Sequence, residues 1–406
     1  MKKILALLTA VILAFSMSAC GGDKPEAFDM NAQWDDIVKQ ADGQTVSFYG
    51  WGGNEDLNKW IDNELAVQVK EKYNITINRV PMDIDEVLAK LSAEKQAGSG
   101  SGSIDMIWIN GENFYSTKEN DLLMGAFAGK LPNFNKYVDK ESDSTKLDFG
   151  YPIEEYEVPY SKAQMVLIND SAKTPETPKS TAELLEFAKK YKGQVTYAAP
   201  PDFTGSAFVR NIIYDVVGYE AFFTMEADKE TVKAFIQPAM DYLNELKPYL
   251  WNEGKTYPAT NAQAENMYAD GELVMAVSYE PYSVALNIDK NIFTETSRSF
   301  LFDKGTIGNT NYITIAKNAP SKAGAMVVIN EMLTPELQAK KYEQVKLLTS
   351  IDYPLLDDNE KALFDNVNIG KGVLDSGELS SKQLPEIPAK FVPIIEEIWL
   401  EEVAGQ

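Results

Sequence analysis

The sequence predicts an α/β protein of two lobes with a cleft between them. Short β-branched and aromatic runs alternate with amphipathic helical patterns, and this alternation occurs twice along the chain. The 406 residues also exceed what a single hydrophobic core usually supports, so two lobes are the default. An apolar fraction of 44% indicates a fully folded chain and not a disordered one.

The first alternation begins with T-V-S-F-Y, which predicts a short buried strand at residues 45–49. A glycine turn follows, and Asn54 is the candidate cap of a helix over residues 57–73. A strand, a helix and a further strand are then predicted at residues 75–80, 85–97 and 104–109. This β-α-β-α-β order implies a parallel sheet with helices on its faces.

The second alternation predicts strands at residues 164–168, 195–198, 273–279 and 305–315, with helices at residues 182–191, 208–216, 232–246 and 322–333. Two or three extended connections between the lobes would allow closure by a hinge motion. We expect residues 44–162 plus 278–310 to form the first lobe. Residues 163–277 plus 311–406 would form the second.

The N-terminus is typical of a secretory signal peptide. Lys2 and Lys3 precede an apolar run at residues 4–15, which is too short to span a membrane as a mature helix. The small residues before Cys20 complete the pattern. We therefore expect a signal peptide at residues 1–19, followed by a tether and a short helix at residues 20–43.

Met-Ser-Ala-Cys at residues 17–20 resembles the cleavage box of bacterial lipoproteins, although that family usually has Leu at the position of Met17. The resemblance implies that Cys20 carries acyl chains such as palmitate, which anchor the protein on the extracytoplasmic face of the cell membrane. The alternative is an ordinary secretion signal with a chance cysteine. Cys20 is the only cysteine, so the chain has no internal disulfide.

Composition excludes several functions. A net charge of −23 argues against nucleic acid as a partner, because phosphate binding needs basic patches. The chain has no histidine, so zinc, copper and histidine-based catalysis lose their commonest residue, and we expect no metal and no cofactor. G-x-S-x-G and phosphate-loop patterns are missing, and we expect no enzyme activity. A secreted hydrolase using Glu112 and Glu280 remains an alternative.

The candidate ligand-binding residues follow predicted strands or lie on the connections between lobes, where open α/β sheets bind ligands. They combine aromatic faces for stacking with amides and carboxylates for hydrogen bonding. They are Trp51, Gly52, Gly53, Asn54, Asn110, Glu112, Asn113, Tyr160, Phe203, Thr204, Tyr279, Glu280, Asn309 and Asn311.

Each of these residues also has a structural interpretation. Trp51 could fill the core beneath its turn, although a tryptophan between glycines is more often exposed to a cleft. Asn110 or Asn113 could cap the following helix, and Thr204 could do the same in P-P-D-F-T-G-S. Tyr160 and Tyr279 could pack in the connections, and the asparagines at residues 309 and 311 could brace a turn.

Four stretches together resemble one protein family. They are F-Y-G-W-G-G-N at residues 48–54, I-D-M-I-W-I-N-G-E-N-F at residues 104–114, G-T-I-G-N-T-N-Y at residues 305–312 and K-A-G-A-M-V-V-I-N-E-M-L-T-P-E at residues 322–336. They are similar to extracytoplasmic solute-binding proteins of ABC importers, in the subgroup of thiamine-type binders. The resemblance implies a type II periplasmic-binding-protein fold and an ABC permease with its ATPase as partners. We also expect the protein to be a monomer.

The expected ligand is a small cationic solute with an aromatic part, such as a thiamine-like molecule. Aromatic faces attract a cation, and Glu112 or Glu280 would neutralise its charge. A neutral sugar also stacks on tryptophan, so sugars and polyamines stay open as ligands. A sensor or adhesin that keeps the binding fold without transport is a further alternative.

Overall fold

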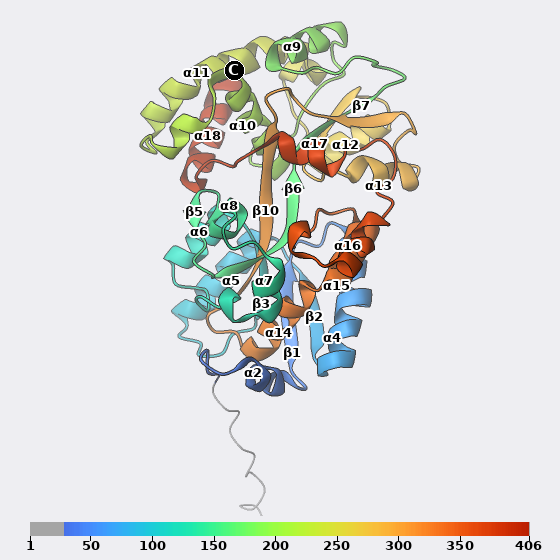
Figure 1. Ribbon diagram of the computed structural model, residues 1–406. Helices are drawn as coiled ribbons and strands as arrows, with labels where there is room; N and C mark the ends of the chain where they lie inside the picture. The colour runs from blue at the N-terminus through green and yellow to red at the C-terminus, as the bar shows by residue number, and fades with distance from the viewer. Residues whose placement is uncertain (1–27, 406) are drawn as a thin grey trace, which may run out of the picture. The chain divides into compact units, whose positions relative to one another are not determined.

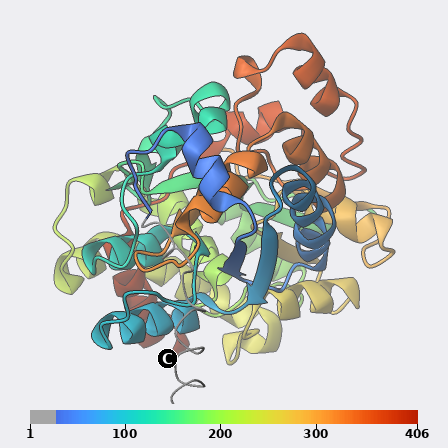
Figure 2. The same ribbon diagram turned by 90° about the horizontal axis from the view of Figure 1, so that it is seen from below.

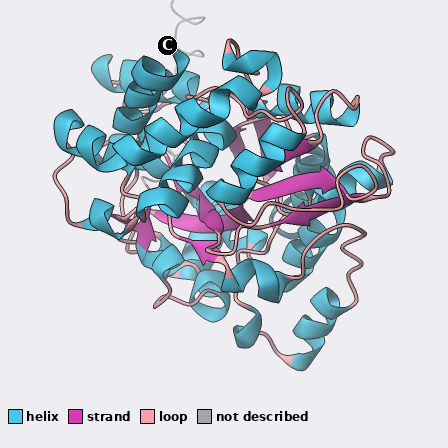
Figure 3. Cartoon of the chain, turned by 90° about the horizontal axis from the view of Figure 1, so that it is seen from above, coloured by secondary structure: helices cyan, strands magenta, loops and turns pink. Residues whose placement is uncertain are grey.

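Residues 28–405 are described by the computed structural model shown in Figure 1. Trp34–Gln406 group as one unit, and the residues before Trp34 group as another. The signal peptide expected at residues 1–19 and the acylation site expected at Cys20 lie outside the described residues. Within the unit that begins at Trp34, strands lie at the centre and helices surround them (Figure 3).

The larger sheet contains β1 (Thr45–Gly50) with β2 (Thr76–Pro81) and β3 (Met106–Ile109) parallel on either side of it. The chain then adds β10 (Thr306–Ile315) antiparallel to β3. β6 (Glu157–Gln164) and the short β11 (Gln383–Leu384) both pair with β10. The predicted β-α-β-α-β order and the parallel sheet are thus confirmed for residues 45–109.

Helices of the first lobe cover this sheet. One continuous helical stretch, with a π-helical turn at its centre, runs where residues 57–73 were predicted. α14 lies against α2 and β1, and α2 and α14 are seen side by side in blue and orange in Figure 2. The helices are α2 (Trp34–Ala41), α3 (Glu55–Trp60), η1 (Ile61–Leu65), α4 (Ala66–Tyr73), α5 (Ile84–Gln96), α6 (Gly111–Glu119), η2 (Ala128–Lys130), α7 (Pro132–Tyr137), α8 (Asp143–Lys146), α14 (Lys322–Met332), α15 (Pro335–Val345), η6 (Tyr353–Leu355) and α16 (Asp358–Asp365).

The second lobe has a smaller sheet, in which β7 (Val166–Asp170) lies between β8 (Met275–Ser278) and β9 (Ser297–Phe300), antiparallel to both. The strand predicted at residues 195–198 is wrong, because this segment is buried but pairs with no strand. The helices of this lobe are α9 (Thr181–Lys190), α10 (Phe203–Val217), η3 (Glu220–Phe223), α11 (Lys229–Leu246), η4 (Lys247–Tyr249), η5 (Trp251–Gly254), α12 (Asn261–Ala269), α13 (Ser283–Asp289), α17 (Ser376–Ser381), η7 (Ala389–Phe391), α18 (Val392–Trp399) and η8 (Leu400–Ala404).

α10 is the centre of the second hydrophobic core. Its residues are buried from Thr204 to Asp215, and the core joins its apolar side chains to those of α9, α11 and α18. An unbroken apolar helix of this kind is expected where neighbours cover every face.

Two long strands run from one lobe to the other. β6 and β10 pair along residues 157–164 and 308–314, with a register irregularity at Asn311/Tyr312 (Figure 1). β6 leads directly into β7 of the second sheet, and β10 begins a few residues after β9 ends. A third connection follows α16 and reaches α17, and its Ile369, Val373 and Leu374 pack against the core beside β7.

The strand pairing distributes the later segments differently from the lobe ranges expected from the sequence. β9, within residues 278–310, pairs with β7 in the second sheet, and β10 pairs with β3 in the first. α14 and α15 pack against β1 and α3, although residues 311–406 were expected in the second lobe. The reason is that the chain crosses back at β10, and no local sequence feature marks that crossing.

Candidate functional site

The carboxyl end of β1 carries an exposed tryptophan. Trp51 is 48% exposed, and its ring stacks on that of Trp108 from β3, with centroids 6.3 Å apart and planes 30° apart. A Cβ atom at Gly53 would lie 2.2 Å from the Trp51 ring, and one at Gly52 would lie 2.5 Å from Pro81. A side chain at either glycine would therefore collide with a neighbouring residue. The absence of a side chain at Gly53 leaves room for the Trp51 ring beside its own turn.

Asn54 connects the two lobes. Its Oδ1 accepts hydrogen bonds from the backbone N–H groups of Asp56 and Leu57 at 3.1 and 3.0 Å, which confirms its predicted capping role. Its Nδ2 donates to Oε1 of Glu280, directly after β8, at 3.2 Å. Lys290 donates to Asp56 at 2.5 Å beside it, so the first turn of α3 contacts the second lobe twice.

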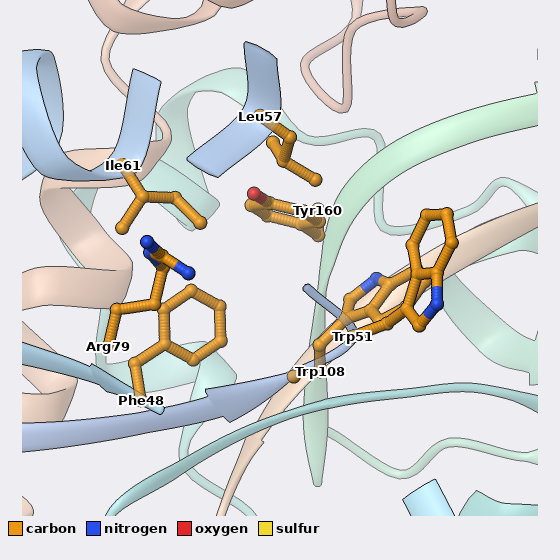
Figure 4. Close-up of a pocket in the computed structure, with 8 residues that line it drawn as sticks. Phe48, Trp51, Leu57, Ile61, Arg79, Trp108 and Tyr160 are labelled. Carbon is orange, nitrogen blue, oxygen red and sulfur yellow. The ribbon is translucent and has the colours of Figure 1, made fainter. Parts of the chain in front are cut away.

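A narrow aromatic pocket adjoins Trp51. Figure 4 shows Trp51 and Trp108 together at one side, Phe48 at the other, and Tyr160 between them. Its volume of about 20 Å³ suits about one water molecule. Trp108 Nε1 and Tyr160 Oη are buried without a hydrogen-bond partner among the described residues.

Three asparagines lie beyond this pocket at the junction of β3, β6 and β10. Asn110 Nδ2 donates to Asn311 Oδ1 at 2.7 Å, and Asn311 Nδ2 donates to Ser161 Oγ at 3.4 Å. Asn110 makes no side-chain cap of α6, contrary to its structural alternative. Asn309 is two residues from Asn311 on the same strand; it is buried, and neither amide atom has a partner in residues 28–405.

The second lobe contributes a buried charged cluster. Arg210 of α10 and Glu386 are each almost fully buried and form two hydrogen bonds of 3.1 and 3.2 Å. Tyr279 Oη donates to Glu386 at 2.7 Å. Arg210 also donates to Ser206 at 2.7 Å, and Ser206 donates to Glu396 at 2.6 Å.

Glu112 of the first lobe faces this cluster. Burial raises the pKa of Glu112, the charge of Arg210 lowers it, and the charges of Glu396 and Glu386 raise it further. Burial also raises the pKa of Glu396. One guanidinium therefore serves three carboxyl groups, and the region has an excess of negative charge when all are ionised.

A second acidic group surrounds Glu280. Burial raises the pKa of Glu280, and the Asn54 hydrogen bond opposes that rise. Burial, together with the charge of Glu280, raises the pKa of Glu265 on α12 to about 7. Asn261 donates from its side chain to Glu265 at 3.0 Å and from its backbone to Asp202 at 3.0 Å.

Most of the remaining candidates are placed near these groups. Phe203 is 39% exposed and packs edge-on against Tyr279 with centroids 5.0 Å apart. Thr204 is buried in the first turn of α10, and Asp202 caps that helix in its place. Asn113 lies within α6, where its carbonyl accepts from Thr117. Tyr160 is buried, its backbone carbonyl accepts from Lys341, and its ring lies edge-on to Phe48.

The structure therefore stacks Trp51 on Trp108 of β3, joins Asn54 to Glu280 and joins Asn110 to Asn311 of β10. Tyr279 contacts Phe203 and Glu386 within the second lobe. Sequence reasoning missed five residues of this region: Trp108, Arg210, Glu265, Glu386 and Glu396. Trp108 stands two residues before Asn110, and Arg210 is a single cation in an apolar helix, so both carried a usable signal. No sequence feature distinguished Glu265, Glu386 or Glu396 from the other glutamates of the chain.

Within residues 28–405 no group of three acidic residues is arranged to hold a metal ion. None of the described helices has the length and apolar character needed to cross a bilayer.

Comparisons with known proteins show which family and fold the chain resembles. Residues 64–358 match the family model described as bacterial extracellular solute-binding protein. The chain is 36% identical over 312 residues to protein YnjB of Escherichia coli strain K12, covering 76% of this chain and 80% of that protein.

Solved structures share the fold at low identity. The spermidine/putrescine ABC transporter substrate-binding protein PotD from Streptococcus pneumoniae has a TM-score of 0.63 and 16% identity, covering 88% of this chain and 98% of that chain. The periplasmic binding protein AfuA from Actinobacillus pleuropneumoniae, solved with fructose-6-phosphate, has a TM-score of 0.60 and 15% identity, covering 89% and 98%. These neighbours confirm the predicted two-lobed α/β fold.

Proposed function

The chain belongs to the bacterial extracellular solute-binding protein family, and we propose that it captures a small organic cation with an aromatic part and delivers it to an ABC import permease. The importer role follows from the family. The class of solute is our own inference, and it rests on the side chains at the junction of the two lobes.

The observation that carries the proposal is the excess of carboxyl groups around one paired arginine. Glu112, Glu386 and Glu396 share Arg210, and Glu280 lies beside Glu265 with an amide as its partner. Burial raises the pKa of Glu112 and of Glu280, so a cation bound beside either group would stabilise its charged form. A bound cation supplies the missing counter-charge.

Aromatic side chains support the second half of the proposal. The Trp51 ring is exposed and held by the Trp108 ring, so its free face is available for stacking without loss of side-chain freedom. Cation–π attraction to such a face is worth about 0.5–2 kcal/mol when water is excluded. A thiamine-like molecule offers both a flat ring and a positive charge.

A polyamine is the second candidate. Tyr279 donates to Glu386 of the acidic group near Glu112, and Glu280 of the other acidic group follows it directly in the chain. Two acidic groups could bind the two ammonium groups of a polyamine. PotD, which has the same fold, is described as a spermidine/putrescine protein. A neutral sugar would leave the carboxyl groups without a counter-charge, and we rank it last.

Calorimetric titration separates these candidates. We expect saturable binding of thiamine or its phosphates with one site per chain, weaker binding of spermidine and putrescine, and no binding of neutral sugars. Tight binding of a sugar in place of any cation would overturn the proposal. We also propose that the protein is not an enzyme, so product formation from the bound solute would contradict us and favour the hydrolase alternative.

Delivery to a permease, as opposed to sensing or adhesion, is tested by uptake of the identified solute in cells that lack this protein. We expect uptake to fall and to return when the intact gene is restored. Unchanged uptake would favour a sensor or adhesin.

We propose further that Cys20 is acylated and that the mature protein is held at the outer face of the cell membrane. Support comes from the M-S-A-C pattern after an apolar run and from the absence of any other cysteine. Cys20→Ser should move the protein from the detergent phase to the aqueous phase in a detergent partition assay. Equal partitioning of both forms would contradict the anchor.

A further inference from the structure

Tyr160 is an extra residue in β6, one of the strands that cross between the lobes. In the pairing of β6 with β10, Asn311 lies opposite Ser161. The next residue of β10, Tyr312, lies opposite Pro159, so Tyr160 has no opposite residue on β10. An extra residue of this kind is a β-bulge, which bends its strand and redirects a side chain, and bulges are frequent beside functional sites.

This bulge lies level with the end of β3, at the edge of the sheet where the candidate site is found. Tyr312, beside the bulge, pairs with Ile109, the last residue of β3. Open α/β sheets bind ligands at the carboxyl ends of such strands. The Tyr160 ring lines the narrow aromatic pocket together with Trp51 and Trp108 (Figure 4). The bulge therefore determines where one wall of this pocket lies.

Lys341 of α15 contacts both the backbone and the ring of Tyr160. Its Nζ donates a hydrogen bond to the Tyr160 carbonyl and lies 4.3 Å from the centre of the Tyr160 ring. The Trp60 ring is 5.5 Å from the same Nζ. A cation is attracted to the face of an aromatic ring, so this contact also favours one orientation of the ring. One amino group thus holds the bulge and the side chain that the bulge redirects.

Burial of this lysine is unfavourable by itself. Its side chain is fully buried, and burial lowers its pKa to about 7. Among residues 28–405 no carboxylate raises that pKa. A methionine or leucine would fill the same space without the loss of hydration that a buried amine suffers. The contact with the Tyr160 carbonyl is one that no apolar side chain at this position can make.

We propose that Lys341 is a positioning residue of the solute site. It keeps the bulge of β6 in place, and through the bulge it keeps the Tyr160 ring in the wall of the aromatic pocket. Lys341 is not among the residues that line the pocket, so it acts on the solute only through Tyr160. Its effect on affinity rests on the proposed function, because the aromatic part of the solute must enter this pocket. Its effect on the position of Tyr160 does not.

The first test needs no solute. Lys341→Met keeps the length of the side chain and removes the amino group, and crystal structures of this variant and of the unmodified protein show where Tyr160 lies. We expect the Tyr160 carbonyl to turn away from α15 and the ring to leave the pocket wall. A bulge and a ring in their original positions would overturn the proposal. Lys340→Met removes an exposed neighbour that pairs with Glu64, and it should leave Tyr160 in place.

The second test compares affinity with stability. Lys341→Met should weaken the binding of thiamine about tenfold in titration calorimetry, because one aromatic wall of the pocket is displaced. Its free energy of unfolding at pH 7 should equal or exceed that of the unmodified protein, because a buried amine without a counter-ion is removed. A lysine with a purely structural role would change stability alone, so unchanged affinity in Lys341→Met would overturn the proposal. Lys341→Leu has a similar volume, carries the same expectations and replaces Lys341→Met if that variant does not fold.

A double-mutant cycle shows whether Lys341 acts through Tyr160. Tyr160→Ala removes the ring, and adding Lys341→Met to it should weaken thiamine binding no further, because the residue that transmits the effect is gone. A further loss as large as that of Lys341→Met alone would overturn the proposal. If the unmodified protein does not bind thiamine, the proposed solute is wrong, and the crystal structures decide the role of Lys341.

Discussion

The side chains of Asn54 and Glu280 meet at 3.2 Å across 226 residues of chain. One end of the Asn54 amide caps α3 in the first lobe, and the other end donates to a carboxylate of the second lobe. The same residue therefore fixes the end of a helix and connects the lobes.

Asn54→Asp tests this double role, because aspartate caps a helix as well as asparagine does but cannot donate to Glu280. We expect little change in melting temperature and a loss of about tenfold in affinity for the transported solute, since a donor is replaced by a like charge. Titration calorimetry measures the affinity, and small-angle scattering reports whether the lobes open. Asn54→Ser, which keeps the cap without adding a charge, should lose less; an unchanged affinity in Asn54→Asp would show that the contact does not assist binding.

Trp51→Ala tests the stacking surface. Because Trp51 is half exposed, its removal should leave the free energy of unfolding within about 1 kcal/mol of the original. Affinity for an aromatic cation should fall about tenfold, since stacking and cation–π attraction are lost. Tyr353→Ala removes another exposed ring and is the control. Equal losses of affinity in both variants would contradict a specific role for Trp51.

The carboxylates are tested by Glu112→Gln and Glu280→Gln, alone and together. Each change removes a negative charge at constant shape, and we expect about tenfold weaker binding of a cationic solute for each. The exposed Glu230→Gln serves as the control. If the double variant binds the solute as well as the original protein does, the charge argument is wrong.

Glu265 predicts a dependence of stability on pH. Its pKa is about 7 in the folded protein, against an ordinary value of 4.5, because of burial and the charge of Glu280. Between these two values the folded protein keeps a proton that the unfolded chain releases, so stability falls as pH rises from about 4.5 to about 7. Glu265→Gln should flatten this part of the curve and add about 2 kcal/mol at pH 8.

Urea unfolding at several pH values measures this effect. Asp202, Asn261 and Ser278 surround Glu265 and remain in place in the variant. Glu245→Gln, an exposed glutamate, should keep the original pH profile. A profile for Glu265→Gln that matches the original would show that Glu265 does not hold this proton.

The pKa of Lys341 predicts that stability rises with pH in the alkaline range, opposite to the effect of Glu265. It is fully buried against the rings of Tyr160 and Trp60, and burial lowers its pKa to about 7. Between pH 7 and about 10.5 the unfolded chain binds a proton that the folded protein does not, so stability should rise with pH across this range.

Lys341→Met should remove that rise, and melting temperatures measured between pH 6 and 10 would show it. Lys340→Met, one residue away on the same helix, removes an exposed lysine that is paired with Glu64 and should keep the rise. A rise that persists in Lys341→Met would contradict the assignment.

Local sequence signals predicted the elements of the first lobe well. The strand predicted at residues 45–49, the cap at Asn54 and the parallel order of β1, β2 and β3 follow from apolar periodicity and turn chemistry, which act over a few residues. The strand predicted at residues 195–198 failed because an apolar run shows burial but not whether a partner strand is adjacent.

The candidate site likewise has features that the sequence predicted and features that only the fold revealed. By itself the sequence determined the fold class and the polar and aromatic residues at strand ends, because these depend on hydrophobic pattern and neighbouring residues. Only the tertiary structure decided that Asn54 meets Glu280, that Arg210 is shared by glutamates from distant segments, and that β10 returns the chain to the first sheet. Those contacts join residues far apart in the chain, and they depend on where the strands cross between the lobes.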